Sequence, residues 1–85
     1  MGETPSEASI FAVVKENVLE ILEEVDEEAI SMEISLKDLG ANSLDRAEIA
    51  TGSMEDLGLS FPMRELAKIK NIGELVKFLE AKVSG

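Results

Sequence analysis

Two apolar stripes with helical spacing, one near each end of the chain, constrain the fold more than any other feature. Their apolar residues recur at intervals of three and four, which places them on one face of an amphipathic helix. The stripes consist of Phe11, Val14, Val18, Ile21 and Val25 near the N-terminus, and Ile72, Leu75, Val76, Leu79 and Val83 near the C-terminus. The sequence therefore predicts one helix over about residues 6–24 and another that follows Asn71.

Residues that commonly cap helices precede both stripes. Thr4, Pro5 and Glu7 fit a capping box with proline at the first helical position, and Ser9 is an alternative start. Asn71 fits the N-cap of the last helix, because its side chain can accept a hydrogen bond from a free backbone N–H group. Both helices are therefore expected to have defined N-termini.

A second main helix is predicted in the middle of the chain. Asn42 or Ser43 caps its N-terminus, and the helix runs to about Leu57. Gly58 provides the C-terminal stop, because glycine readily adopts the left-handed conformation that ends many helices. A short helix over about residues 63–69 is expected before the last main helix.

Residues 25–42 lack a sustained helical period, and we interpret them as a long loop. Ser35 could begin a single helical turn within it, which Gly40 would end. The apolar residues expected to hold the loop against the core are Ile30, Met32, Ile34, Leu36 and Leu39. The sequence thus predicts an all-α fold, a small four-helix bundle of three main helices and one short helix. A single domain over residues 1–85 is expected, with residues 1–5 and 84–85 frayed.

Missing residue types and net charge exclude several classes of function. The chain has no Cys and no His, which excludes a disulfide framework, a Cys–His nucleophile and imidazole ligands, and no metal site is predicted. The formal net charge of −10 opposes binding to nucleic acid or anionic membranes and favours basic partner surfaces, although it also serves solubility. Residues 1–9 are acidic and polar, unlike a signal peptide, and no apolar run could span a membrane. A cytoplasmic monomer is expected.

The second helix carries two modest apolar stripes. The stripe expected to face the core consists of Ile49, Ala50, Ser53 and Leu57. The other consists of Leu44, Ala47, Thr51 and Met54, and it is available for a partner or a bound chain unless it packs against the long loop. Gly52 costs roughly 1 kcal/mol relative to Ala in a helix interior, so another part of the chain is expected to approach it closely.

Ser43 lies where the long loop meets the second helix. Taken alone, a serine there is most often a helix cap, and the chain has no His to activate it as a nucleophile. A phosphodiester on Ser43 would be stabilised by the free N–H groups of the helix N-terminus. The run Leu39-Gly40-Ala41-Asn42-Ser43-Leu44-Asp45 resembles the phosphopantetheine attachment signature of acyl carrier proteins. The resemblance in length, charge and helix order covers nearly the whole chain.

This resemblance implies roles for individual residues. Ser43 is expected to carry 4′-phosphopantetheine, taken from coenzyme A, with Asn42 and Leu44 beside it, and the protein is expected to be a carrier and no enzyme. Most family members have Asp where this chain has Asn42, and the change removes one charge next to the site. The partner-recognition face that the resemblance implies includes Asp45, Arg46, Ala47, Glu48, Thr51, Met54 and Glu55, together with Leu44.

Residues 40–49 resemble, more narrowly, the donor carriers of polyketide β-branching cassettes, and Arg46 is the residue tied to that subgroup. In such cassettes a malonyl group is decarboxylated to acetyl, and the acetyl group passes to an HMG-CoA synthase homologue. The resemblance therefore implies four partners: a phosphopantetheinyl transferase, an acyltransferase, a decarboxylating ketosynthase-like enzyme and the HMG-CoA synthase homologue. A local pair between Arg46 and nearby acids is the alternative interpretation of that residue.

The sequence is also compatible with other classes of protein. The chain could be a carrier of fatty-acid, aminoacyl or D-alanyl groups, or a small acidic helical module that binds proteins. A calcium-binding loop that begins at Asp38 fails at three key positions, where Gly40, Ser43 and Ile49 replace the expected residues. An enzyme is disfavoured by the thin core and by the missing His and Cys.

Overall fold

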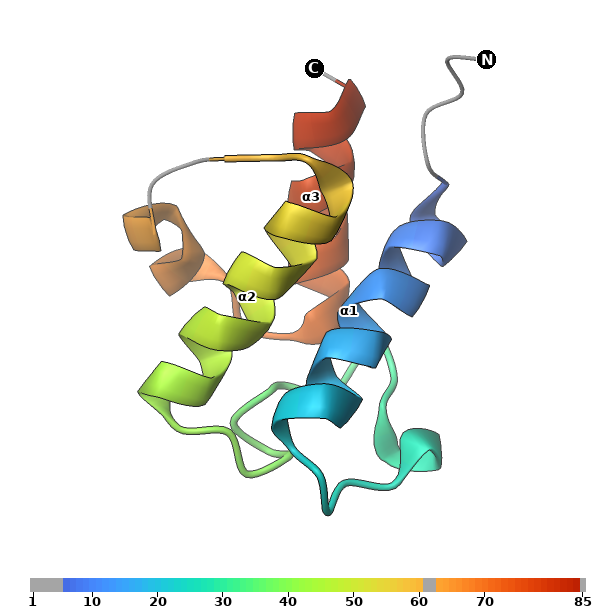
Figure 1. The fold of residues 1–85 in the computed structure, drawn as a ribbon, viewed down its shortest axis with the longest axis vertical. Coiled ribbons are helices and arrows are strands. Elements are labelled where there is room, and N and C mark those ends of the chain that lie inside the picture. The colour runs from blue at the N-terminus through green and yellow to red at the C-terminus, as the bar shows by residue number, and fades with distance from the viewer. Residues whose placement is uncertain (1–5, 61–62, 85) are drawn as a thin grey trace.

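The computed structural model describes residues 6–60 and 63–84, and this part of the chain is helical without strands. Three α-helices form the bundle, and Figure 1 shows α3 behind α1 and α2. The elements are α1 (Glu7–Ile21), the 3₁₀ turn η1 (Glu27–Ala29), α2 (Ser43–Leu57), the short 3₁₀ helix η2 (Met63–Lys68) and α3 (Ile72–Ser84). The predicted all-α bundle of three main helices and one short helix is confirmed.

Helix α1 is shorter at its C-terminus than the sequence predicted. Ser6 is its N-cap and accepts a hydrogen bond from the backbone N–H of Ser9 at 3.2 Å. The predicted capping residue Thr4 lies outside the described residues, and Ser9 lies within the helix rather than at its start. The helix ends at Ile21 and not at residue 24, because Leu22 leaves the helical conformation. Acidic residues at 20, 23 and 24 are unfavourable near the negative C-terminal end of a helix.

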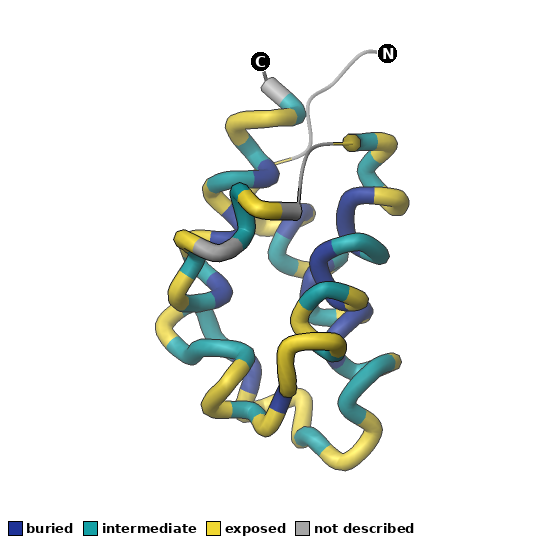
Figure 2. Tube along the Cα trace, turned by 90° about the vertical axis from the view of Figure 1, so that its left-hand side faces the viewer, coloured by how far each residue is buried: buried dark blue, intermediate teal, exposed yellow. Residues whose placement is uncertain are grey.

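The core lies between the three main helices. Its fully buried aliphatic side chains come from all of them and are Ile10, Val14, Val18, Ile49, Ile72, Val76 and Leu79. Phe11 and Ile21 of the predicted first stripe are only partly buried, because the helix turns Ile10 toward the core instead. Val25 lies beyond the end of the helix and is partly buried as well. Figure 2 shows buried residues recurring along the helices, with exposed residues between them and in the loops.

The long loop between α1 and α2 is held against the core, as predicted. Ile30 is buried, and Met32, Ile34, Leu36 and Leu39 are partly buried against the core cluster. Backbone hydrogen bonds from Ile72 to Ile34 (2.9 Å) and from Gly73 to Met32 (2.8 Å) join the loop to the start of α3. The loop carbonyls thereby satisfy two free N–H groups of that helix.

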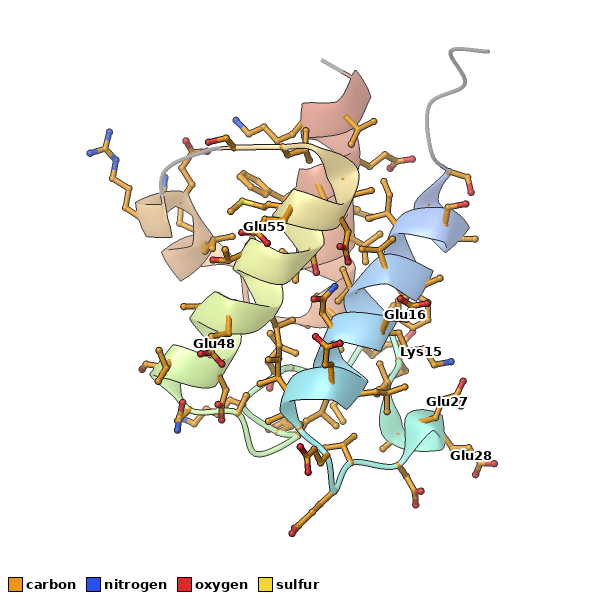
Figure 3. All side chains as sticks on the ribbon, viewed as in Figure 1. Lys15, Glu16, Glu27, Glu28, Glu48 and Glu55 are labelled. Atoms are coloured by element: carbon orange, nitrogen blue, oxygen red, sulfur yellow. The ribbon has the colours of Figure 1, made fainter. Side chains whose placement is uncertain are left out.

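The 3₁₀ turn η1 was not predicted. An ion pair between Lys15 Nζ on α1 and Glu27 Oε2 on η1, at 3.1 Å, joins this turn to the first helix, and both residues are labelled in Figure 3. The described residues form no helix long and apolar enough to cross a membrane.

Candidate functional site

Asn42, and not Ser43, caps helix α2. Asn42 Oδ1 accepts a hydrogen bond from the backbone N–H of Asp45 at 2.7 Å. The Asp45 carboxylate in turn accepts one from the backbone N–H of Asn42 at 3.3 Å, which completes a capping box. The sequence allowed either Asn42 or Ser43 as the N-cap, and the structure shows that it is Asn42. The Ser43 hydroxyl is consequently not needed to cap the helix.

Ser43 occupies the first helical position of α2 with an exposed side chain. Its Oγ accepts a hydrogen bond from Nη2 of Arg46, one turn further along the helix, at 3.3 Å. Free backbone N–H groups and the positive end of a 15-residue helix also favour an anion at this position. The surroundings of the hydroxyl therefore suit a negatively charged group attached to it.

The turn before α2 sets the position of Ser43. Ala41 is 5% exposed, and its backbone N–H donates to the carbonyl of Leu36 at 3.0 Å. Gly40 has a φ angle of 95°, a conformation that L side chains rarely adopt. A glycine is needed here because the chain reverses direction before the buried alanine and the helix cap. Gly40 thus supports the local geometry that exposes Ser43.

An apolar hollow opens beside Ser43. It has a volume of about 400 Å³ and lies between α2, η2, α3 and the long loop. The lining residues are Leu36, Ser43, Arg46, Ala47, Ala50, Leu66, Ile69 and Leu75. Sequence reasoning did not identify the contribution of Leu66, Ile69 and Leu75, because nothing in their spacing shows that η2 and α3 face the N-terminal half of α2.

The predicted recognition residues fall in different environments. Leu44 is 66% exposed, an unusual exposure for a large aliphatic side chain, and Arg46, Glu48 and Glu55 are exposed too. Figure 3 labels Glu48 and Glu55 at two positions along α2. Asp45, Ala47 and Thr51 are partly buried, and Ala47 lines the hollow.

Met54 corrects one sequence-based expectation. It was expected on the outer, partner-facing stripe of α2, but it is 6% exposed and belongs to the core cluster. The helix rotates so that Ile49, Ala50, Ser53 and Met54 all face inward, while Leu57 is only partly buried. Met54 therefore packs the core in this structure and does not form part of an exposed recognition face.

The expected close approach at Gly52 is confirmed. A Cβ atom at this position would collide with Oδ1 of Asn17 on α1. Asn17 is 8% exposed, and its Nδ2 donates to Asp56 Oδ2 on α2 at 3.1 Å. These contacts fix how α1 crosses α2, on a face separate from the hollow beside Ser43. Over residues 6–60 and 63–84, no group of three or more acidic, His or Cys side chains is arranged to hold a metal ion.

Comparison with known proteins explains this arrangement. Residues 12–79 match the family described as "Phosphopantetheine attachment site". The chain belongs to this family of acyl carrier proteins. The carrier is 49% identical to the "Polyketide biosynthesis acyl-carrier-protein AcpK" of Bacillus subtilis (strain 168). The alignment spans 74 residues and covers 87% of this chain and 90% of that protein. It is 39% identical over 57 residues to an "Acyl carrier protein" of Helicobacter acinonychis (strain Sheeba), covering 66% of this chain and 73% of that one. No solved structure matches.

Membership of the family defines the general role of the carrier. The protein is a carrier and not a catalyst, and its cofactor is covalently attached 4′-phosphopantetheine. It interacts with a phosphopantetheinyl transferase and with biosynthetic enzymes. The exposed hydroxyl of Ser43, the adjacent guanidinium and the open hollow fit such a group, since they offer an attachment atom, a counter-charge and space.

Proposed function

We propose that Ser43 is the attachment residue for 4′-phosphopantetheine in this carrier. The supporting observation is that the Ser43 hydroxyl is exposed and not needed for the cap, while Asn42 caps the helix beside it. In loading, Ser43 Oγ forms a bond to the phosphorus of coenzyme A that carries the pantetheine. The bond from that phosphorus to the bridging oxygen breaks, and adenosine 3′,5′-bisphosphate leaves. A base of the transferase takes the hydroxyl proton, because this chain has no His.

When attached, the group supplies a terminal thiol that holds an acyl chain as a thioester. The residues of the carrier then have three tasks in this proposal. Ser43 anchors the arm, Asn42 and Asp45 hold the helix start that presents it, and the hollow beside Leu36 gives apolar surface for the attached chain. Loading of the wild-type protein and loss of loading in Ser43→Ala test the assignment.

The proposal extends to polyketide biosynthesis. Its support is the 49% identity to a relative that is named as a polyketide biosynthesis carrier and has nearly the same length. We assign the carrier the donor role in β-branching: it accepts malonyl from an acyltransferase, the ketosynthase-like enzyme decarboxylates the group to acetyl, and the HMG-CoA synthase homologue receives the acetyl. The resemblance of residues 40–49 to such donors, with Arg46 as the distinguishing residue, is the motive for this finer assignment.

A transfer assay separates this role from the alternatives. Acetyl loaded on the carrier should pass to an HMG-CoA synthase homologue of a β-branching pathway faster than to a fatty-acid ketosynthase. Faster transfer to the fatty-acid enzyme would favour a general fatty-acid carrier. Loading with an amino acid by an adenylating enzyme would favour an aminoacyl or D-alanyl carrier.

The recognition face in this proposal excludes Met54, which is buried, and consists of exposed or partly exposed residues of α2. These are Leu44, Asp45, Arg46, Ala47, Glu48, Thr51 and Glu55. Exposed carboxylates beside an exposed leucine suit small, transient and salt-sensitive interfaces with basic, partly apolar surfaces. We also propose that the carrier is a single-domain monomer in the cytoplasm.

A further inference from the structure

The guanidinium of Arg46 lies beside the atom that the proposed function makes the attachment point. Arg46 Nη2 donates to Ser43 Oγ at 3.3 Å, and both side chains are exposed on the same side of the first turns of α2. Because Asn42 and Asp45 form the capping box, neither Ser43 nor Arg46 is needed for the cap. A cation is thus in place next to Oγ before any group is attached.

Two further basic side chains line the surface next to Arg46. A second hollow of about 250 Å³ adjoins the first, and it is lined by Lys37, Arg46 and Lys70 together with uncharged residues. The described residues that line the two hollows include no carboxylate. Three of the 8 basic residues of the chain therefore line the hollow that adjoins the one beside Ser43. Carboxylates lie close as well, since Asp45 completes the cap of α2 and Glu74 accepts a hydrogen bond from the backbone N–H of Lys70.

We propose that Arg46 is a positioning residue that binds the phosphodiester on Ser43 and restricts rotation of the arm about its linkage to the helix. The inference rests on the proposed attachment at Ser43. Once Oγ is an ester oxygen, the anionic oxygens on the same phosphorus lie within reach of the guanidinium that now contacts Oγ. A guanidinium can donate two parallel hydrogen bonds to such oxygens, and charge-assisted bonds are stronger than the present bond to a neutral hydroxyl.

Orientation, rather than affinity, is the effect expected of this contact. The arm is covalently attached, so no binding energy is needed to keep it on the protein. Arg46 is exposed, and its attraction for the phosphate is partly screened by solvent and salt. Because Arg46 also lines the apolar hollow, a phosphodiester held by it starts the arm at the mouth of that hollow.

Lys37 provides a matched control for the direct contact. It lines the same hollow as Arg46, and it is an exposed cation, but it lies in the loop and not on the helix that carries Ser43. Arg46→Gln and Lys37→Gln remove the same charge from the same region. Arg46→Lys keeps the charge but loses the planar pair of donors.

The test uses the loaded protein, with complete loading verified by intact mass. Two signals are measured: the ³¹P resonance of the phosphodiester and the solvent exchange of the Arg46 guanidinium protons before and after loading. We expect loading to slow guanidinium exchange several-fold in the wild type. We expect Arg46→Gln to shift the ³¹P resonance and to lengthen its transverse relaxation time. Arg46→Lys should give intermediate values, and Lys37→Gln should give the values of the wild type.

A guanidinium exchange rate that does not change on loading would overturn the proposal. Equal ³¹P effects of Arg46→Gln and Lys37→Gln would also overturn it, because they would indicate the electrostatic effect of any nearby positive charge and not a direct contact. The exchange measurement needs no variant, so it decides the question even if Arg46→Gln cannot be loaded. A wild-type protein that gains no phosphopantetheine would refute the attachment at Ser43 instead, and the mass measurement shows this before any resonance is recorded.

Discussion

Asn17 on α1 donates a hydrogen bond from Nδ2 to Asp56 Oδ2 on α2, at 3.1 Å. The same Nδ2 donates to the carbonyl of Val13 at 2.9 Å, so the amide is held on both sides. Its Oδ1 faces Gly52 at the place where a Cβ atom would be. The helices can cross this closely only because residue 52 has no side chain.

Gly52→Ala is expected to destabilise the fold even though alanine is the better helix former. Helix propensity alone would stabilise the variant by about 1 kcal/mol. The new methyl group would displace the buried Asn17 amide, which makes two hydrogen bonds. Overpacking of this kind usually costs about 1–3 kcal/mol. A net loss of about 1 kcal/mol in the free energy of unfolding should appear in urea denaturation.

The control for this prediction is the double variant Asn17→Ala with Gly52→Ala. It should cost less than the sum of the two single changes, because the collision is gone. A Gly52→Ala protein that is more stable than the wild type would contradict the close crossing.

Asn42 and Ser43 should differ in their importance for stability. Asn42→Ala removes the cap of α2 and is expected to cost about 1 kcal/mol. Ser43→Ala removes a hydroxyl that caps nothing and should change stability by less than about 0.5 kcal/mol, as exposed substitutions usually do. Urea unfolding of both variants checks the pair, and a larger loss in Ser43→Ala would refute the assignment of the cap.

Gly40 should resist substitution because of its backbone conformation alone. A Cβ atom at Gly40 would meet no atom within 4 Å, so the cost comes from its φ angle of 95°. We expect Gly40→Ala to lose about 1 kcal/mol and Gly40→Asn to lose less, because asparagine tolerates positive φ better. Equal melting temperatures for Gly40→Ala and the wild type would show that this turn adopts another conformation.

Charge reversal on α2 should weaken partner binding without unfolding the carrier. Glu48→Lys places a positive charge on the proposed recognition face and is expected to lower the affinity for a partner enzyme several-fold, with the difference shrinking at high salt. Glu28→Lys on η1 makes the same change of charge away from that face. Equal affinities for the two variants, measured by titration calorimetry, would place recognition elsewhere.

Asp45 is unsuitable for this experiment, although it belongs to the proposed recognition face. Its carboxylate completes the capping box of α2, so reversal of its charge would disturb the helix start as well as the surface. The effects on binding and stability could not be separated.

Helices and caps were the predictable part of the structure. The stripe with Ile72, Val76 and Leu79 and the cap at Asn71 describe α3 correctly, since periodicity and capping depend on residues close in sequence. It was harder to predict which stripe of α2 faces inward, because this depends on the angle at which α1 crosses α2. The sequence indicated a close approach at Gly52 but not its partner, and the helix rotation that buries Met54 follows from packing.

The site shows the same division. Ser43 and its neighbours form a contiguous run, so its resemblance to the attachment signature was enough to single them out as candidates. The hollow beside Ser43 brings together residues from the loop, α2, η2 and α3, and no local pattern contains that arrangement. The contact between Arg46 and Ser43 joins residues one helical turn apart, a spacing compatible with many other partners for an exposed arginine.

The most direct test of the account is the intact mass of the protein after incubation with coenzyme A and a broad-specificity phosphopantetheinyl transferase, followed by peptide mapping. We predict a gain of one phosphopantetheine located on Ser43, and no gain in a folded Ser43→Ala variant. Loading of Ser43→Ala, or a modification mapped to another residue, would contradict the assignment of Ser43 as the attachment site.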